Sequence, residues 1–208
     1  YEPGTILKLD KSLYGLKQAP RVFNTVLNAH VVNSMGFKQC SSDPCVYIKM
    51  TKSGPVYLAV YVDDLIIVGK DTNEIDQIKA DLRKEFDMDD RGDAEYILGM
   101  QIQRDRTSRT LKLTQTQYAK DVVAKFHMDK SACAMKVPIR SDHKMSGDDC
   151  PVTPEEKAYM KKIPYRNAIG SLMYLATCTR PDISYAVSMC ASYMHNPGRV
   201  HWDAVKDI

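Results

Sequence analysis

Residues 55–68 are the most apolar stretch of the sequence, and two adjacent carboxylates, Asp63 and Asp64, interrupt it near its centre. Apolar runs on both sides of a two-residue polar interruption predict two strands joined by a tight turn. We therefore expect strands over residues 55–62 and 65–68, with Asp63 and Asp64 as the turn. An unpaired buried carboxylate costs roughly several kcal/mol. Another interaction must therefore offset the free-energy cost of placing this pair in an apolar stretch.

Hydrophobic periodicity predicts a mixed α+β body up to about residue 130 and a helical part beyond about residue 153. Helices are expected to start at Pro20 and end near Gly36, and to start again after Asp71. Three pairs fit a capping box, the pattern that begins a helix: Asp71 with Glu74, Thr114 with Gln117, and Thr153 with Glu156. Further strands are expected over residues 45–50, 96–103 and 110–113. Residues 130–151 are polar and lack periodicity, which predicts a linker.

The composition is that of a globular protein with one large domain or slightly more. The chain has 208 residues, of which 44% are hydrophobic and 26% charged, and its net charge of +3 says little about partners. Six cysteines without a C-x-x-C pair indicate reduced thiols in an intracellular protein, although a metal site at His30, Cys40 and Cys45 is an alternative. Neither a membrane-spanning run nor a signal peptide is expected. Because the first residue is Tyr1 and the last residues have helical spacing, we expect a piece of a longer protein.

The residues alone leave two interpretations of Asp63 and Asp64. Asp is common in turns, so the pair can be an ordinary polar hairpin turn. Adjacent carboxylates on a rigid hairpin can instead bind Mg²⁺, which prefers a few carboxylates together with substrate phosphates. Two such ions, about 3.5–4 Å apart, would assist both oxygens of a phosphoryl transfer and would neutralise the carboxylates.

Several motifs together resemble the reverse transcriptase domain of copia-type LTR retrotransposon Pol polyproteins. Residues 61–64 (YVDD) resemble the catalytic signature, residues 12–21 (SLYGLKQAPR) the template- and nucleotide-positioning motif, and residues 96–102 (YILGMQI) the primer-grip hairpin. Residues 165–175, 179–183 and 201–202 are similar to the segment that leads toward ribonuclease H. The resemblance covers essentially the whole chain, and the order and spacing of its motifs agree.

This resemblance implies an α+β fold in which an antiparallel sheet with helices forms the palm and part of the fingers of a right-hand polymerase. A thumb and a helical connection segment would follow. The expected divisions are partial fingers and palm with the YVDD hairpin over residues 1–94, the primer-grip hairpin and thumb helix over 95–130, a linker over 131–152, and the helical connection over 153–208.

The implied activity is RNA-directed DNA synthesis, in which a primer 3′-hydroxyl attacks a deoxynucleoside triphosphate with the help of two Mg²⁺ ions or, as a substitute, Mn²⁺. Asp63 and Asp64 would be the catalytic metal ligands. The implied partners are an RNA template, a DNA primer, deoxynucleoside triphosphates and the rest of the Pol polyprotein, with integrase upstream and ribonuclease H downstream. The expected location is a cytoplasmic virus-like particle, with no membrane partner.

The resemblance also assigns two groups of binding residues. Those for the template and nucleotide would be Gly15, Lys17, Gln18, Pro20, Arg21 and Tyr61, and those of the primer grip Leu98, Gly99 and Met100. Each has an ordinary alternative: Gly15 as a turn glycine, the charged and amide side chains as solvated groups, and Gly99 as a strand bulge. Arg104, Arg106, Arg109 and Lys112 would lie at a hairpin tip, either solvated or against a nucleic-acid backbone.

One element of the family pattern is missing. The family uses a third carboxylate from a strand upstream of the positioning motif, and only residues 1–7 precede that motif here. Asp10 lies inside the motif and does not match that position. We therefore expect this chain to be inactive alone. A degenerate transposon remnant, a non-catalytic nucleic-acid-binding module of the same fold and an unrelated metal hydrolase remain as alternatives.

Overall fold

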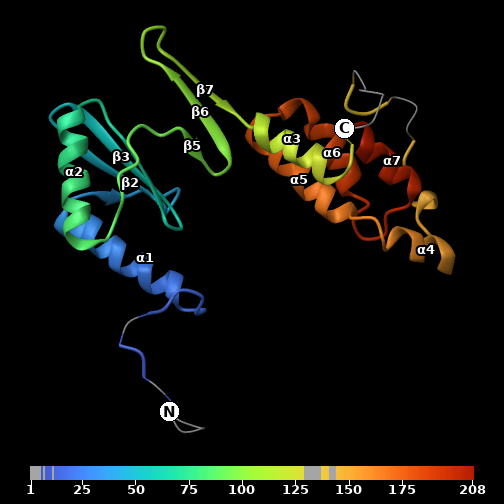
Figure 1. Cartoon of the computed structure of the whole chain (residues 1–208), viewed down its shortest axis with the longest axis horizontal. Coiled ribbons are helices and arrows are strands. Elements are labelled where there is room, and N and C mark those ends of the chain that lie inside the picture. Colours follow the sequence, from blue (N-terminus) through green and yellow to red (C-terminus); the bar gives the residue numbers. More distant parts are fainter. Residues whose placement is uncertain (1–5, 7, 11, 129–136, 141–143) are drawn as a thin grey trace. The chain divides into compact units, whose positions relative to one another are not determined.

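The computed structural model describes residues 6, 8–10, 12–128, 137–140 and 144–208. The chain forms two compact units, Tyr1–Asp93 and Ala94–Ile208, and each is described below by itself (Figure 1). Both combine an antiparallel sheet with helices, which confirms the α+β class at that level.

The first unit is built on a four-stranded antiparallel sheet in which neighbours in sequence are neighbours in space. Its order is β1 (Lys38–Gln39), β2 (Val46–Thr51), β3 (Gly54–Tyr61) and β4 (Asp64–Val68). The hairpin predicted around the two carboxylates is confirmed, because β3 pairs with β4 and Tyr61 lies opposite Asp64.

The turn of this hairpin lies one residue earlier than predicted. Its two residues are Val62 and Asp63, and Asp64 is the first residue of β4. The displacement follows from the register, which places Val60 opposite Leu65 and Leu58 opposite Ile67, so that all four apolar side chains share one face. Sequence spacing alone cannot distinguish this register from one shifted by a residue.

Two helices accompany the sheet. The helix predicted from Pro20 is confirmed as α1 (Ala19–Ala29), which continues as a π-helix (His30–Ser34) and ends just before Gly36 at a φ of +74°. The second helix, α2 (Thr72–Glu85), has Asp71 as its N-cap, and the Asp71 side chain accepts a hydrogen bond from the Asn73 backbone N–H at 2.8 Å. Glu74 does not complete a capping box; its carboxylate accepts a hydrogen bond from Ser53 Oγ.

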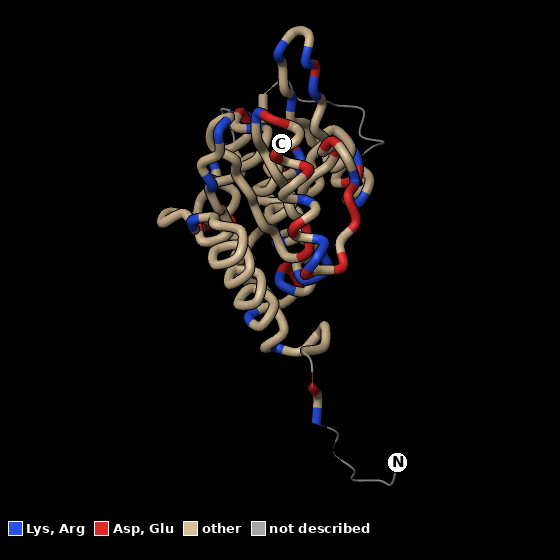
Figure 2. The backbone as a smooth tube through the Cα atoms, turned by 90° about the vertical axis from the view of Figure 1, so that its left-hand side faces the viewer, with Lys and Arg blue, Asp and Glu red and all other residues tan. Residues whose placement is uncertain are grey.

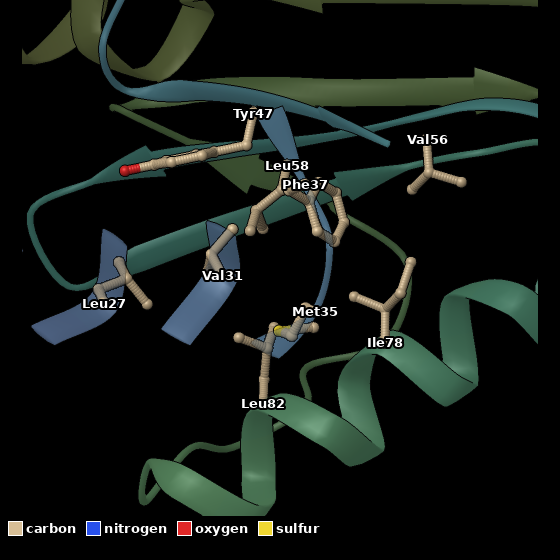
Figure 3. Packing of buried hydrophobic residues seen from close by; sticks show 9 residues of the cluster. All are labelled: Leu27, Val31, Met35, Phe37, Tyr47, Val56, Leu58, Ile78 and Leu82. Carbon is tan, nitrogen blue, oxygen red and sulfur yellow. The ribbon is translucent and has the colours of Figure 1, made fainter. Parts of the chain in front are cut away.

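The core of this unit lies between the sheet and both helices. Figure 3 shows side chains of α1, the π-helix and α2 converging on the same face of the sheet. Along β3, Val56 and Leu58 are fully buried while Tyr57 and Tyr61 are exposed, as expected for a strand with one covered face. The buried residues are Leu27, Val31, Met35, Phe37, Tyr47, Val56, Leu58, Ile78 and Leu82.

The second unit joins a three-stranded sheet to a helical body. Its strands are β5 (Tyr96–Ile97), β6 (Met100–Asp105) and β7 (Thr110–Thr114). The helical part predicted beyond residue 153 is confirmed. In the described part of the chain, no helix combines the length and apolarity needed to cross a bilayer. The helices are α3 (Thr116–Lys125), α4 (Pro154–Met160), α5 (Tyr165–Cys178), α6 (Ser184–Ala191) and α7 (Arg199–Asp207).

Two predictions of helix starts have different outcomes here. Thr153 and Glu156 form a reciprocal capping box at the start of α4. The capping box predicted for Thr114 and Gln117 is wrong, because Gln115 is the N-cap of α3 and makes no side-chain capping bond. The Gln117 amide donates instead to Asp121, one turn along the helix, at 2.8 Å.

Part of the predicted linker lies outside the described residues, namely 131–136 and 141–143. Its later part is structured. Gly147–Asp149 form a 3₁₀ helix whose N-cap is Ser146, and the Ser146 carbonyl accepts a hydrogen bond from Nε2 of the buried His201 at 3.1 Å. Nδ1 of the same ring accepts from the Gly198 N–H at 2.8 Å, and the ring stacks on Tyr193 with centroids 3.9 Å apart.

We predict that Leu58→Ala lowers the free energy of unfolding by about 2–5 kcal/mol, because it opens a cavity where the side chain is fully buried. Urea denaturation followed by far-UV circular dichroism measures this change. The matched control is Val68→Ala in the neighbouring strand, where the side chain is 55% exposed and the cost should be about 1 kcal/mol or less. Equal losses in the two variants would contradict the assignment of faces.

A second prediction concerns pH. Burial lowers the pKa of His201, so the folded protein holds the ring neutral while the unfolded chain protonates below about pH 6.5. The stability contributed by His201 is therefore full above that pH and is lost as the pH falls. Urea unfolding at pH 7.5 and 5.5, followed by fluorescence of Trp202, the single tryptophan, should show this loss.

In the His201→Gln variant the same pH change should have a smaller effect on stability, because the buried titrating group is gone. His195→Gln replaces an exposed histidine of the same unit and should keep the wild-type dependence. If His201→Gln retained the full pH dependence, another group would be responsible for it.

Candidate functional site

The two carboxylates of the YVDD sequence lie at the exposed end of the β3–β4 hairpin. Both Asp63 and Asp64 are exposed, and so are their neighbours Tyr61 and Val62, at 57% and 63%. The burial penalty inferred from the apolar flanks is therefore wrong. The flanking strands bury one face only, and the turn carries the carboxylates beyond the covered region into solvent.

The strand register decides what surrounds Asp64. Because side chains alternate along a strand, Asp64 shares the outer face of the sheet with its partner Tyr61 and with Ile66 and Val68 of its own strand. This face is opposite the one that α1 and α2 cover. A ligand can therefore approach Asp64 and Tyr61 from one side without displacing the core.

The oxygen atoms of Asp63 and Asp64 determine which metal ion this turn could bind. Carboxylate oxygens are the ligands that Mg²⁺ prefers, so the chemistry of Asp63 and Asp64 fits such an ion. The described residues, however, contain no group of three or more His, Cys, Asp or Glu side chains that could hold a metal ion. The pair is thus a partial ligand set. The alternative site at His30, Cys40 and Cys45 finds no support.

The backbone of the turn is strained. Val62, its first residue, has a φ of +54°, in the left-handed region that β-branched residues rarely adopt. Hairpin turns usually have Gly or Asn where φ is positive. Such strain costs about 1–3 kcal/mol and persists only where the surrounding structure imposes it, which is common at functional sites.

The positioning motif forms a turn that leads directly into α1. Gly15 has a φ of +93°, a conformation that favours glycine, so its role as a turn residue is established. The backbone N–H of Ala19 donates to the Leu16 carbonyl at 3.0 Å, which closes the turn before the helix. The polar and proline side chains assigned to template and nucleotide binding are exposed: Lys17, Gln18, Pro20 and Arg21. If the motif positions template and nucleotide at the two carboxylates, residues 15–20 must lie near the Asp63 turn in space, and this stays a prediction.

The primer-grip sequence also forms a turn. Leu98 and Gly99 connect β5 to β6 with φ values of +50° and +71°, while Ile97 pairs with Met100. The alternative of a bulge at Gly99 is therefore wrong, since two positive φ angles make a tight hairpin. The hydroxyl of Tyr174, on α5, donates to the Leu98 carbonyl. Sequence reasoning missed this tyrosine, because a hydroxyl on a helix face gives no signal of a distant backbone partner.

The four basic residues of the second hairpin do not form a single face. Arg104 lies opposite Leu111 in the register, while Lys112 lies opposite Gln103. The side chains of these two cations therefore point to opposite faces of the β6–β7 ribbon. Between the strands, the Asp105 carboxylate accepts hydrogen bonds from the Thr107 N–H and the Ser108 hydroxyl at 2.8 and 2.7 Å. Figure 2 shows both basic and acidic positions on this hairpin.

Comparison with known proteins identifies the family. Residues 1–141 match the model of the family described as reverse transcriptase (RNA-dependent DNA polymerase). The chain is 48% identical over 98% of its length to the retrovirus-related Pol polyprotein from transposon TNT 1-94 of Nicotiana tabacum. It is 34% and 35% identical, over 99% of its length, to those from transposons RE2 and RE1 of Arabidopsis thaliana.

The chain spans only a small part of these relatives, 15% of the length of the tobacco polyprotein and 13% of each Arabidopsis one. No solved structure matches it. The family model covers more than half of the chain, and the similarity to Pol polyproteins extends over nearly all of it. The chain therefore belongs to the reverse transcriptase family of retrotransposon Pol polyproteins.

Proposed function

We propose that this chain supplies the palm, part of the fingers and the thumb of an RNA-directed DNA polymerase. In this assignment the first unit holds palm and fingers, β5 to α3 form the primer grip and thumb, and the helices from α4 onward form the connection. The observation that carries the proposal is the exposed pair Asp63 and Asp64 on a tight turn, fixed to a sheet whose other face is packed. Membership in the family supports it.

The proposed chemistry is attack of a primer 3′-hydroxyl on the α-phosphate of a deoxynucleoside triphosphate. Asp63 and Asp64 would hold Mg²⁺, which supplies charge stabilisation for the attacking and leaving oxygens when bound. The contribution of the protein itself is to hold the two carboxylates in position. The turn is anchored by the Tyr61–Asp64 strand pair, which would keep the carboxylates fixed. A fixed charge does not have to be reoriented when the reaction begins, so no free energy of reorganisation is required.

The roles that we propose for the residues that bind template, nucleotide and primer follow from the exposure and chemistry of their side chains. The Gln18 amide offers a donor and an acceptor to a base or sugar, while Lys17 and Arg21 offer cations to phosphates. Leu98, Gly99 and Met100 would contact the primer end through a turn that Tyr174 tethers to α5. We propose RNA template, DNA primer and deoxynucleotides as substrates, and other Pol domains as covalent partners within a cytoplasmic particle.

The strain at Val62 yields a prediction. Val62→Gly should raise the free energy of unfolding by about 0.5–1 kcal/mol, because Gly adopts a positive φ without a side-chain clash. In a longer chain that includes the natural upstream segment, the same substitution should slow primer extension, since a looser turn holds the carboxylates less firmly. Urea denaturation tests the first part. Val68→Gly, in the regular part of β4, serves as the control and should instead destabilise by about 0.5–1 kcal/mol.

A further prediction is that the 208-residue chain expressed as printed does not extend a primer. Asp63 and Asp64 approach a metal from one turn, and the described residues offer no third ligand beside them. Primer extension on an RNA template with Mg²⁺ should be detected only for a longer chain that includes the natural upstream segment. In that longer chain Asp63→Asn should reduce the rate at least a hundredfold, or about 2.7 kcal/mol in barrier.

The control for the longer chain is Asp76→Asn, which removes an exposed carboxylate of α2 and should change the rate less than twofold. Extension by the printed chain that Asp63→Asn abolishes would show that the third carboxylate lies within these residues. Primer–template binding without extension by either chain, unaffected by Mg²⁺, would favour a non-catalytic binding module. Neither binding nor extension would favour a transposon remnant.

A further inference from the structure

The turn at Leu98 and Gly99 lies at a weakly supported edge of its sheet. Its first strand, β5, is the edge strand of the three-stranded sheet and has two residues, Tyr96 and Ile97. Strands usually have about 3–10 residues, so this pairing holds the turn only weakly. Leu98 also has a φ of +50°, which bulky residues rarely adopt unless the surrounding structure imposes it. A contact from outside the sheet is therefore important for the position of this turn.

Tyr174 supplies such a contact. Its hydroxyl donates a hydrogen bond to the carbonyl of Leu98, which lies 76 residues earlier in the chain and in the same unit. Leu98 is the second residue of a four-residue turn that begins at Ile97 and ends at Met100. The hydrogen bond that closes such a turn joins its first and last residues, so it does not use the carbonyl of the second. Tyr174 thus binds the turn without competing with the strand pairing.

The helices of the second unit hold the ring of Tyr174 in place. Tyr174 is half-buried on α5, where the next two residues, Leu175 and Ala176, are buried. Its ring lies edge-on to the ring of Tyr118 on α3, with centroids 5.2 Å apart and an angle of 89° between the planes. Aromatic rings favour this arrangement. Tyr118 itself packs against the core cluster that contains Leu175, so the hydroxyl is carried by a ring that two helices support.

We propose that Tyr174 is a positioning residue for the 3′ end of the primer. By holding the Leu98 carbonyl, it fixes the turn at Leu98 and Gly99 relative to α3 and α5. A primer end that contacts this turn is then held in one place, and small displacements of a reacting group cost large factors in rate. The inference rests on the function proposed above, in which residues 98–100 form the primer grip. Tyr174 acts through the turn and does not itself contact the primer.

Hydrogen exchange of the 208-residue chain, followed by mass spectrometry, tests the tether without any polymerase activity. Tyr174→Phe keeps the ring and removes only the hydroxyl. We expect the backbone amides of residues 96–102 to exchange at least threefold faster in this variant, because the turn opens more easily. Residues 165–178 should exchange as in the wild type, which checks that α5 remains folded.

The matched control is Tyr193→Phe. The Tyr193 hydroxyl also donates to a distant backbone carbonyl of the same unit, that of Met145, at 3.0 Å. Its removal deletes the same kind of hydrogen bond at a place that has no role in the primer grip. Exchange at residues 96–102 should therefore remain within 1.5-fold of the wild type.

Single-turnover primer extension tests the positioning role, in a longer chain that includes the natural upstream segment. With saturating deoxynucleotides, Tyr174→Phe should lower the maximal rate at least threefold and change the Kd for the primer–template less than twofold. This split is expected because the contacts to the duplex remain while its end is held less firmly. Tyr193→Phe should change neither value more than 1.5-fold.

The outcomes separate this inference from the function on which it rests. Unchanged exchange at residues 96–102 in Tyr174→Phe, or equal extension rates for Tyr174→Phe and Tyr193→Phe, would overturn the positioning role and leave the polymerase assignment intact. If the longer wild-type chain bound a primer–template and did not extend it, the polymerase assignment would fail and the positioning role with it. Faster exchange in Tyr174→Phe would then identify a contact that serves the fold alone.

Discussion

The packing of one face of β3 determines the geometry on which the candidate site depends. Val56 and Leu58 are fully buried against α1 and α2, and this fixes which side chains of β3 point inward. Because side chains alternate, Tyr61 must then face outward, and its partner Asp64 must share that face. A register shift of one residue would turn Asp64 toward the core, where a carboxylate without a partner is costly.

The three motifs for which we propose roles in polymerisation share one structural feature, a short turn at the end of a packed element that contains a residue with positive φ. Val62 lies in the turn before Asp64, Gly15 in the turn before α1, and Leu98 with Gly99 between β5 and β6. Tight turns hold exposed groups in place without a long loop to order. The cost is strain at the non-glycine positions, and the rigid elements on either side maintain it.

Buried polar groups have opposite roles at two places in the second unit. His201 is fully buried, and both of its ring nitrogens are hydrogen-bonded, so it joins the Ser146 segment to α7. Gln115 is also buried, but its amide donor is unpaired in the described part of the chain. A fully paired buried polar group stabilises a fold, whereas an unpaired buried donor costs free energy that the surrounding packing must offset.

The sequence by itself determined the elements that depend on local patterns: the β3–β4 hairpin, the helix starts at Pro20 and Thr153, the helical end of the chain and the motifs that indicate the family. The tertiary structure decided the rest. It placed the turn at Val62 and Asp63, exposed the carboxylates, gave α3 the N-cap Gln115 and buried His201 against Ser146. These features depend on strand register and on contacts between distant residues, which local periodicity does not encode.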